Sequence, residues 1–255
     1  MDLGLKGKYA IITGGTSGIG AGIGRVLASE GCNLIPVFMV NDEQAEAYKE
    51  SVEKEYGVEV KPMKYNVAKP ELVDELFERL DKEVEHVDIL VNNAAGGYLY
   101  GQKTFDQITY EEWQSGVEGI LNHVFYMSRC FTALARKRNQ KGNIVNISAK
   151  AAFVSVSKPQ TPYGPVKGAV AALSRRMAHE LIDYGITVNC LIPGYVRTEN
   201  HYADPNSESY KKREALLRIG WATPEDIGNI VAFYCSEKSR QIIGDLIDCS
   251  GGTMF

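Results

Sequence analysis

Short apolar runs alternate along this chain with longer segments in which apolar residues recur every three or four positions. The short runs are typical of buried strands, and the longer periodic segments are typical of amphipathic helices. The pattern predicts strands over residues 8–13, 33–40, 58–65, 86–92, 143–147 and 187–192. It predicts helices between residues 20 and 31, over 42–56, 70–84 and 110–138, and from about residue 163 onward, with the long fourth helix interrupted near Gly116 and Gly119.

The regular alternation of strands and helices predicts an α/β fold built on a parallel, doubly wound sheet. The 255 residues suit one such domain, and no linker, repeat or low-complexity stretch divides them, so we expect a single domain over residues 1–255. Residues 195–220 break the pattern, because they are polar and rich in tyrosine. Since they follow the carboxyl end of a strand, where ligands bind in such folds, we expect a substrate lid, with a solvated helix pair as the alternative.

Composition narrows the possible classes of function. The net charge is -4 and the pI is about 5.7, which disfavours a nucleic-acid partner, since such proteins usually carry a net basic surface. The five cysteines are scattered and the four histidines form no closely spaced pair, so we expect neither a disulfide framework nor a metal site. No apolar run approaches the roughly 20 residues of a membrane span, and no signal pattern opens the chain, so we expect a cytoplasmic protein without a membrane partner.

A glycine-rich stretch lies between the first predicted strand and the helix that follows it. Glycines there let the chain turn tightly and let a diphosphate approach the backbone, and the helix N-terminus offers free N–H groups with a partial positive charge. The strand, loop and helix context therefore predicts a phosphate site. Its members are Gly14, Gly15, Thr16, Ser17, Gly18, Ile19 and Gly20.

Tyr163 and Lys167 form the candidate acid/base pair. They are four residues apart, so on a helix both side chains lie on one face, one turn apart. A lysine ammonium lowers the free energy of a nearby tyrosinate, so the phenol can exchange a proton near neutral pH. Pro165 is tolerated only in the first turn of a helix, so this helix is expected to begin between residues 162 and 164.

These motifs, in this order, resemble those of the classical short-chain dehydrogenase/reductase family over nearly the whole chain. The matching segments are Thr13-Gly14-x-x-x-Gly18-x-Gly20, Asn92-Asn93-Ala94-Ala95-Gly96, Tyr163-x-x-x-Lys167, Asn189 before Pro193-Gly194, Thr198, and residues 244–252. The resemblance implies a Rossmann-type sheet, a nicotinamide cofactor, hydride transfer between that cofactor and a hydroxyl or keto small molecule, and a dimer or tetramer built through the long helices.

The resemblance also implies roles for single residues. Tyr163 would act as the acid in reduction and the base in oxidation, and Lys167 would bind the nicotinamide ribose and lower the pKa of the tyrosine. The remaining residues would bind the cofactor: Gly14, Thr16, Ser17, Gly18, Ile19 and Gly20 at the diphosphate, Asn66, Val67, Asn93, Ala94 and Gly96 along the adenosine side, and Pro193, Gly194, Val196 and Thr198 at the nicotinamide.

Two catalytic positions of the family are changed in this sequence. Ala149 stands where the family places its catalytic serine; Ser148 is one residue early and should face the other side of the strand, while Ser155 and Ser157 would need the following loop to fold back. Counting seven residues from Trp113, Ile120 stands where the family has an asparagine, and Asn122 is about 200° away around the helix.

The cofactor side is changed as well. The end of the second strand should carry an acidic residue for an NAD ribose or a nearby arginine for an NADP phosphate, and the count gives Phe38 and Met39, with Asn41 and Asp42 beyond. Pro36 is expected to interrupt this strand. Because no basic residue is placed for a 2′-phosphate, NAD is favoured, with NADP and a complete loss of cofactor binding as the alternatives.

Two functions therefore stay open. The first is an active oxidoreductase acting on a hydroxyl or keto compound, with a 3-hydroxyacyl-CoA thioester among the candidates and Arg129, Arg136, Arg197 and Lys211 as possible anion contacts. The second is a degenerate subunit that supports an active paralogue of the same family. The expected assembly is accordingly a homotetramer or a heterotetramer with that paralogue.

Overall fold

Seven parallel strands form one sheet with the order β3-β2-β1-β4-β5-β6-β7. The structure is a computed structural model that describes residues 2–96, 103–154 and 161–253. The order reverses between β1 and β4, which is the topological switch point of a doubly wound fold. The predicted Rossmann-type α/β architecture is thereby confirmed. The strands are β1 (Tyr9–Thr13), β2 (Asn33–Phe38), β3 (Met63–Lys64), β4 (Ile89–Asn92), β5 (Gly142–Ile147), β6 (Ile186–Pro193) and β7 (Leu246–Cys249).

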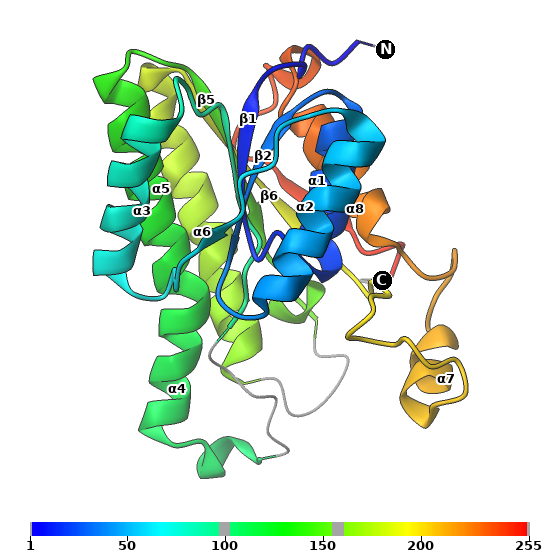
Figure 1. Ribbon diagram of the computed structural model, residues 1–255. Helices are drawn as coiled ribbons and strands as arrows, with labels where there is room; N and C mark the ends of the chain where they lie inside the picture. The colour runs from blue at the N-terminus through cyan, green and yellow to red at the C-terminus, as the bar shows by residue number, and fades with distance from the viewer. Residues whose placement is uncertain (1, 97–102, 155–160, 254–255) are drawn as a thin grey trace.

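Helices cover both faces of this sheet (Figure 1). One buried cluster packs α1 and α8 against the sheet, and a second cluster packs α3, α5 and α6 against its other face. The helices are α1 (Gly18–Ser29), α2 (Asp42–Tyr56), α3 (Pro70–Glu83), α4 (Tyr110–Gly116), α5 (His123–Lys137), α6 (Tyr163–Leu181), α7 (Glu208–Glu214) and α8 (Pro224–Tyr234). The predicted start of the Tyr163 helix is correct.

The long fourth helix is divided where its glycines lie. A π-helical stretch, Val117–Asn122, separates α4 from α5, so the expected interruption near Gly116 and Gly119 is present. π-Helical turns often occur at functional sites, because they rotate the following side chains out of the α-helical register. This stretch packs against α6, the helix that carries Tyr163.

Pro36 does not break its strand, which corrects the sequence-based expectation. It lies inside β2 and pairs in register with Ile12 of β1. Its missing N–H is on the side facing β3, because Leu34, two residues earlier, donates its N–H to Glu59 O on that side. The ladder between β2 and β3 is interrupted at this point, with a bridge at Leu34 and Val60 and pairing again from Met63. The third strand is therefore two residues long rather than the eight expected over 58–65.

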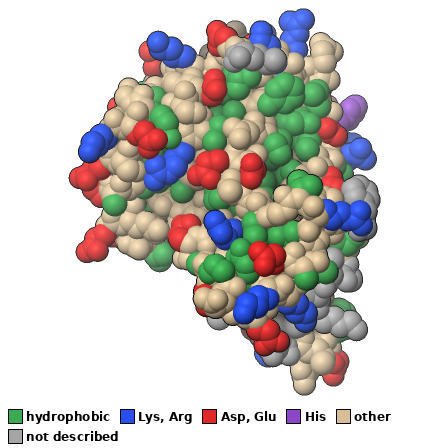
Figure 2. All heavy atoms as spheres, turned by 90° about the vertical axis from the view of Figure 1, so that its right-hand side faces the viewer, with side chains coloured by type: hydrophobic (Ala, Val, Ile, Leu, Met, Phe, Trp, Pro, Cys, Tyr) green, Lys and Arg blue, Asp and Glu red, His purple; other side chains and the backbone are tan. Residues whose placement is uncertain are grey.

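Other boundaries also differ from the hydrophobic pattern. The strand expected over 86–92 begins at Ile89, and neither α7 nor α8 was evident from periodicity. Acidic and basic side chains are interspersed on the face that Figure 2 shows, rather than gathered by sign. Within the described residues, no helix is long and apolar enough to cross a bilayer.

Candidate active site

A cleft of about 990 Å³ lies where β1, β4, β5 and β6 end. It contains residues from the glycine loop, the Asn93 loop, the segment after β5, the first turn of α6 and the segment after β6. Most of the residues that sequence reasoning assigned to the site line it, namely Gly14, Ser17, Gly18, Ile19, Asn93, Ala94, Gly96, Tyr163, Pro193, Gly194, Val196 and Thr198. Thr16, Gly20, Asn66, Val67 and Lys167 are not among its lining residues.

The glycine loop is held close to the next loop of the sheet. Gly14 and Gly18 have φ of +64° and +49°, in the left-handed region that favours glycine. A Cβ on Gly20 would lie 2.1 Å from Gly14 O and 2.7 Å from Asn93 Nδ2. Gly20 is therefore needed for close packing beneath the loop, and its role is structural support rather than lining.

Thr13 and Asn93 fasten the ends of β1 and β4 together. Thr13 Oγ1 accepts hydrogen bonds from the backbone N–H groups of Asn93 (2.9 Å) and Ala94 (3.0 Å). Asn93 Nδ2 donates to Thr13 O at 3.0 Å. Deeper in the sheet, Asn92 Nδ2 donates to Asn146 Oδ1, and Asn146 Nδ2 donates to Ser174 Oγ on α6, both at 2.8 Å. This buried polar chain holds the Tyr163 helix in register with the strands.

The N-terminus of α1 already holds an anionic group from the chain itself. The N–H of Gly18 donates to Glu199 Oε1 at 2.7 Å, and Glu199 follows Thr198 on the segment after β6. A carboxylate at a helix N-terminus is stabilised by free N–H groups and the helix dipole. Glu199 thus shows that this amide is placed to bind an anion, as a diphosphate would require.

Tyr163 and Lys167 lie as the helical spacing requires. Tyr163 is the first residue of α6 and lines the cleft. The Nζ of Lys167 is 5.9 Å from the centroid of the Tyr163 ring and donates to Ile147 O at 2.7 Å. Lys167 is 3% exposed, and burial lowers its pKa to about 8. The pair sits with the phenol at the cleft and the ammonium beneath it.

Replacing Lys167 with methionine should stabilise the fold. The pKa of Lys167 falls from its ordinary 10.5 to about 8 on folding, so between these values the unfolded chain binds more protons. The unfolding free energy therefore rises with pH across that window, and below about pH 8 the buried charge lowers stability. Lys167→Met should raise the unfolding free energy at pH 7 by about 1–3 kcal/mol.

Urea unfolding at pH 7 and pH 10 measures this effect. The difference between variant and wild type should shrink at pH 10, and Lys212→Met, which removes an exposed charge on α7, should change neither value. A destabilised Lys167→Met variant at pH 7 would show that the hydrogen bond to Ile147 O outweighs the burial of charge.

The position of the family's catalytic serine has no hydroxyl in this chain. Ala149 lines the cleft, whereas Ser148 is 3% exposed and its Oγ donates to Lys167 O at 2.7 Å, away from the cleft. The strand alternation that predicted this difference therefore agrees with the observed orientations. Ser155 and Ser157, the alternative hydroxyls, lie outside the described residues.

The position of the family's asparagine is apolar. Ile120 is 2% exposed and packs with Val124, Val166 and Val170. Next to it, the buried His123 has its Nδ1 3.2 Å from Gly119 O. Burial, and then the charge of Lys167, lower the pKa of His123 to about 3, so this imidazole is neutral at physiological pH. Neither Ile120 nor His123 carries the side-chain amide that the family places at this position.

Two of the five residues expected on the adenosine side, Asn66 and Val67, lie away from the cleft, whereas Asn93, Ala94 and Gly96 line it. The Oδ1 of Asn66 accepts from the N–H of Ala68 at 3.1 Å, and Val67 packs against the α3 and α5 side of the sheet. Beyond the end of β2, Met39 and Val40 are exposed, and Asp42 forms an ion pair with Lys64.

The four cations that the sequence offered as possible anion contacts do not line the cleft. Arg129 pairs with Asp74, Arg136 stacks on Tyr184, and Arg197 and Lys211 are exposed; none of the four is among the residues lining the cleft. The cations that do line it are Lys150, directly after Ala149, and Arg213 on α7. Arg213 ends the basic run Lys211-Lys212-Arg213, within the region expected to be a lid or a solvated helix pair, and Lys150 carried no sequence signal beyond its place after a strand.

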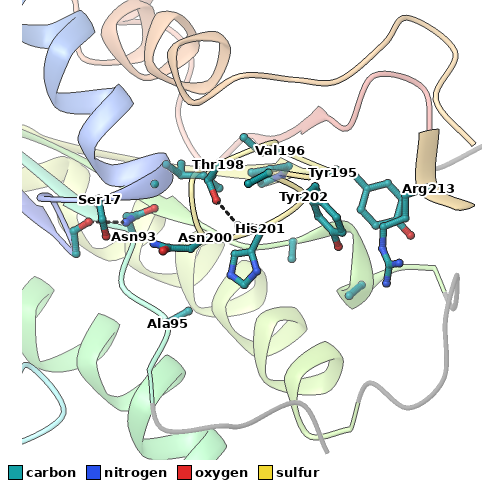
Figure 3. Close-up of a pocket in the computed structure, with 18 of the residues that line it drawn as sticks. Ser17, Asn93, Ala95, Tyr195, Val196, Thr198, Asn200, His201, Tyr202 and Arg213 are labelled. Carbon is teal, nitrogen blue, oxygen red and sulfur yellow. Dashed lines mark hydrogen bonds between the residues drawn. The ribbon is translucent and has the colours of Figure 1, made fainter. Parts of the chain in front are cut away.

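Figure 3 shows the cleft with Ser17 and Asn93 at one end and Tyr195, Tyr202 and Arg213 at the other. The segment that carries Tyr195 and Tyr202 is joined to residue 222 by a bridge between Val196 and Ala222. The region expected to be a lid thus leaves and rejoins the body at neighbouring points. That it opens and closes over a substrate stays a prediction.

Known proteins are similar to this chain over nearly its whole length. The family model described as enoyl-(acyl carrier protein) reductase matches residues 14–254. A 3-oxoacyl-[acyl-carrier-protein] reductase FabG of Aquifex aeolicus is 31% identical over 99% of this chain and 99% of its own length. The sorbose reductase SOU1 of Candida albicans is 29% identical over 97% of this chain and 87% of its own length.

A solved structure is similar over the same extent. The L-sorbose reductase of Gluconobacter frateurii, complexed with NADPH and L-sorbose, superposes with a TM-score of 0.89 at 28% identity, covering 100% of this chain and 99% of that one. Together with the fold and the motifs, these matches show that the chain belongs to the short-chain dehydrogenase/reductase family.

Proposed function

We propose that this protein is an NAD(P)-dependent oxidoreductase that interconverts a hydroxyl and a carbonyl group on a small molecule. The observation that carries the proposal is that Tyr163 and the glycine loop line one cleft, with the buried ammonium of Lys167 5.9 Å from the tyrosine ring. A proton donor and a phosphate-binding loop in one cleft are what hydride transfer to a carbonyl requires.

The chain's own residues have separable tasks in this reaction. Gly18 and its neighbours would hold the diphosphate at the N-terminus of α1. Pro193, Gly194, Val196 and Thr198 would hold the nicotinamide, which supplies or accepts the hydride when bound. Tyr163 would donate its phenolic proton to the carbonyl oxygen in reduction and take it back in oxidation. The positive charge of Lys167 would stabilise the tyrosinate that remains after the proton has left.

We propose NAD as the preferred cofactor. The residues at the end of β2, from Phe38 to Asp42, are apolar, amide or acidic, and Asp42 is paired with Lys64, which leaves no cation aimed at a 2′-phosphate in that segment. The L-sorbose reductase from Gluconobacter frateurii is described in complex with NADPH, so NADP is the alternative cofactor to compare with NAD.

The substrate class follows from the relatives only in outline. One relative is named for a 3-oxoacyl thioester on a carrier protein and others for sorbose, and both are carbonyl compounds. A 3-hydroxyacyl thioester is one candidate substrate, since one relative is named for a 3-oxoacyl group. The protein would work as a homotetramer or a heterotetramer with a paralogue.

The second candidate is a catalytically degenerate subunit. It is favoured by Ala149 and Ile120, which remove the hydroxyl and the amide that assist the tyrosine in the family. For this candidate we propose an assembly like that of the heteromeric 2-(hydroxyphenylmethyl)succinyl-CoA dehydrogenase, whose degenerate subunit the chain resembles as a whole. In that case the cleft would be idle and an active paralogue would supply catalysis.

Titration of the isolated chain with NADH and NADPH, followed by nucleotide fluorescence, tests the proposal. We expect saturable binding of both, tighter for NADH, and binding to Glu199→Gln about two- to fivefold tighter, because Glu199 then no longer places a carboxylate on the Gly18 amide. Glu237→Gln, a distant acidic residue, is the matched control. If neither nucleotide binds wild type or Glu199→Gln, the oxidoreductase proposal is wrong and the degenerate-subunit candidate remains.

A further inference from the structure

The end of the cleft farthest from the glycine loop is cationic and aromatic. Lys150 lies in a short 3-10 turn (Lys150–Ala152) after β5, and its Nζ is 3.4 Å from the centroid of the Tyr195 ring. The guanidinium of Arg213 is 5.6 Å from the Tyr195 centroid and 5.1 Å from that of Tyr202. Two cations from separate elements thus share one aromatic wall.

Both cations retain unused hydrogen-bond donors. Lys150 is 4% exposed, and its buried Nζ has no hydrogen-bond partner among the described residues. Arg213 donates from Nη1 to the backbone O and the Oγ of Ser209, while its buried Nε has no partner among the described residues. A buried donor without an acceptor is destabilising, and more so when it is charged. An acceptor that entered from the cleft would therefore stabilise the arrangement.

The aromatic side chains make this end of the cleft a built site. Tyr202 and Tyr210 both stack on Trp221, with centroid distances of 5.0 and 4.7 Å, and Tyr195 meets Tyr202 edge-on at 5.9 Å. Tyr202 has φ of +61°, a left-handed conformation that is rare for a bulky side chain and is maintained only where surrounding contacts enforce it.

Charge points to the sign of the ligand. Lys150 and Arg213 repel each other, and with burial as the larger cause this repulsion lowers the pKa of Lys150 to about 8; Asp248 acts in the opposite direction. The acid in the cleft wall, Asp204, already accepts the N–H of Asn206 within its own turn. An anion between the two cations would relieve their repulsion. It would also accept hydrogen bonds from the two unused donors, Lys150 Nζ and Arg213 Nε.

We propose that Lys150 and Arg213 form a subsite that binds a carboxylate or phosphate group of the substrate, at the opposite end of the cleft from the diphosphate loop. This proposal rests on the proposed oxidoreductase function, because the bound anion is a substrate only if the cleft carries out that reaction. It makes the substrate an anionic hydroxy or keto compound, whose charged end is held by these two residues while its hydroxyl or carbonyl lies at Tyr163.

Trp221 allows binding to be measured without catalysis. It stacks in the aromatic wall, and replacing the other tryptophan, Trp113, with phenylalanine leaves Trp221 as the single tryptophan reporter. In this background, quenching would be titrated with 3-hydroxybutyrate, 3-hydroxyhexanoate and their methyl esters, and with glycerol 3-phosphate and inorganic phosphate, each with and without NADH. The acids test the carboxylate source, and the phosphates test the other source.

We expect binding of at least one anionic probe to saturate. Its neutral counterpart, which is the methyl ester of an acid or glycerol for glycerol 3-phosphate, should bind at least about tenfold more weakly. Lys150→Met and Arg213→Gln should each weaken that binding by about 10- to 100-fold, the range for one hydrogen bond to a charged group. Lys211→Met, which removes an exposed cation from the same helix as Arg213, is the matched control and should leave the affinity unchanged.

The outcomes separate this inference from the proposed function. Equal affinity for an acid and its ester, no saturation by any anion, or unchanged binding in both Lys150→Met and Arg213→Gln would overturn the anionic subsite. NADH binding that persists in those cases leaves the oxidoreductase proposal intact. Anion binding lost in both variants, without any nucleotide binding, supports the subsite and contradicts the oxidoreductase. Circular dichroism of each variant identifies those that fail to fold.

Discussion

Replacing Tyr163 with phenylalanine should lower kcat/KM by about 100- to 10,000-fold, the usual contribution of a positioned general acid or base. The change removes one oxygen at the first residue of α6 and keeps the aromatic ring. The contact between this ring and the ammonium of Lys167 is therefore kept as well. Binding of NADH should be almost unchanged, because the residues of the glycine loop are untouched. The loss should therefore fall on kcat rather than on cofactor affinity.

Steady-state kinetics of the isolated chain in both directions measures this prediction. Tyr184→Phe, which removes a phenol from a half-exposed ring far from the cleft, is the control and should retain full activity. Turnover that survives Tyr163→Phe would show that another group transfers the proton. A wild-type chain with no turnover alone, but with turnover beside a paralogue, would favour the degenerate-subunit candidate instead.

The sequence predicted those features that local chemistry determines. The glycine loop, the Tyr163 and Lys167 spacing and the alternation of strands and helices are encoded over a few residues each, and the structure places them together at one sheet edge. The opposite orientations of Ser148 and Ala149 also followed from strand alternation alone. These inferences needed no knowledge of distant contacts.

The features that were missed depend on contacts between segments far apart in the chain. Pro36 suggested a broken strand, but its lost hydrogen bond is on the side where β3 is interrupted, which only the pairing of β2 reveals. Arg213 is one of three adjacent basic residues on α7. Successive residues of a helix point in different directions, and of these three only Arg213 lines the cleft. Lys150 became a candidate only when its burial against Tyr195 was seen.

The sequence also implied roles that this structure leaves as proposals. Asn66 and Val67 were assigned to the adenosine side because of their place in the family's pattern, yet the cleft does not reach them. Lys167 was assigned to the ribose, and its Nζ here donates to Ile147 O. Its burial below the phenol is compatible with the electrostatic role and leaves the ribose contact to be tested with bound cofactor.

Restoring the family's serine by Ala149→Ser should raise kcat/KM by about 10- to 1000-fold. The upper limit is the contribution of one well-placed donor to a developing oxyanion. Ala149 lines the same cleft as Tyr163, and its extended backbone, with φ of -160° and ψ of 152°, accepts serine without strain. The native Ser148 cannot supply the donor, because its Oγ is committed to Lys167 O at 2.7 Å.

Two further variants make the Ala149→Ser prediction specific. Ala151→Ser adds a hydroxyl to the same cleft wall two residues later, and it should give no gain, because its position differs from that of the family's serine. In the double variant Ala149→Ser with Tyr163→Phe, the gain should disappear, since the serine only assists a proton transfer made by the tyrosine. An unchanged or lower kcat/KM in folded Ala149→Ser would mean that the reacting oxygen does not lie next to this residue. A chain that is inactive as wild type but gains Tyr163-dependent turnover with Ala149→Ser would identify Ala149 as the change that made the subunit degenerate.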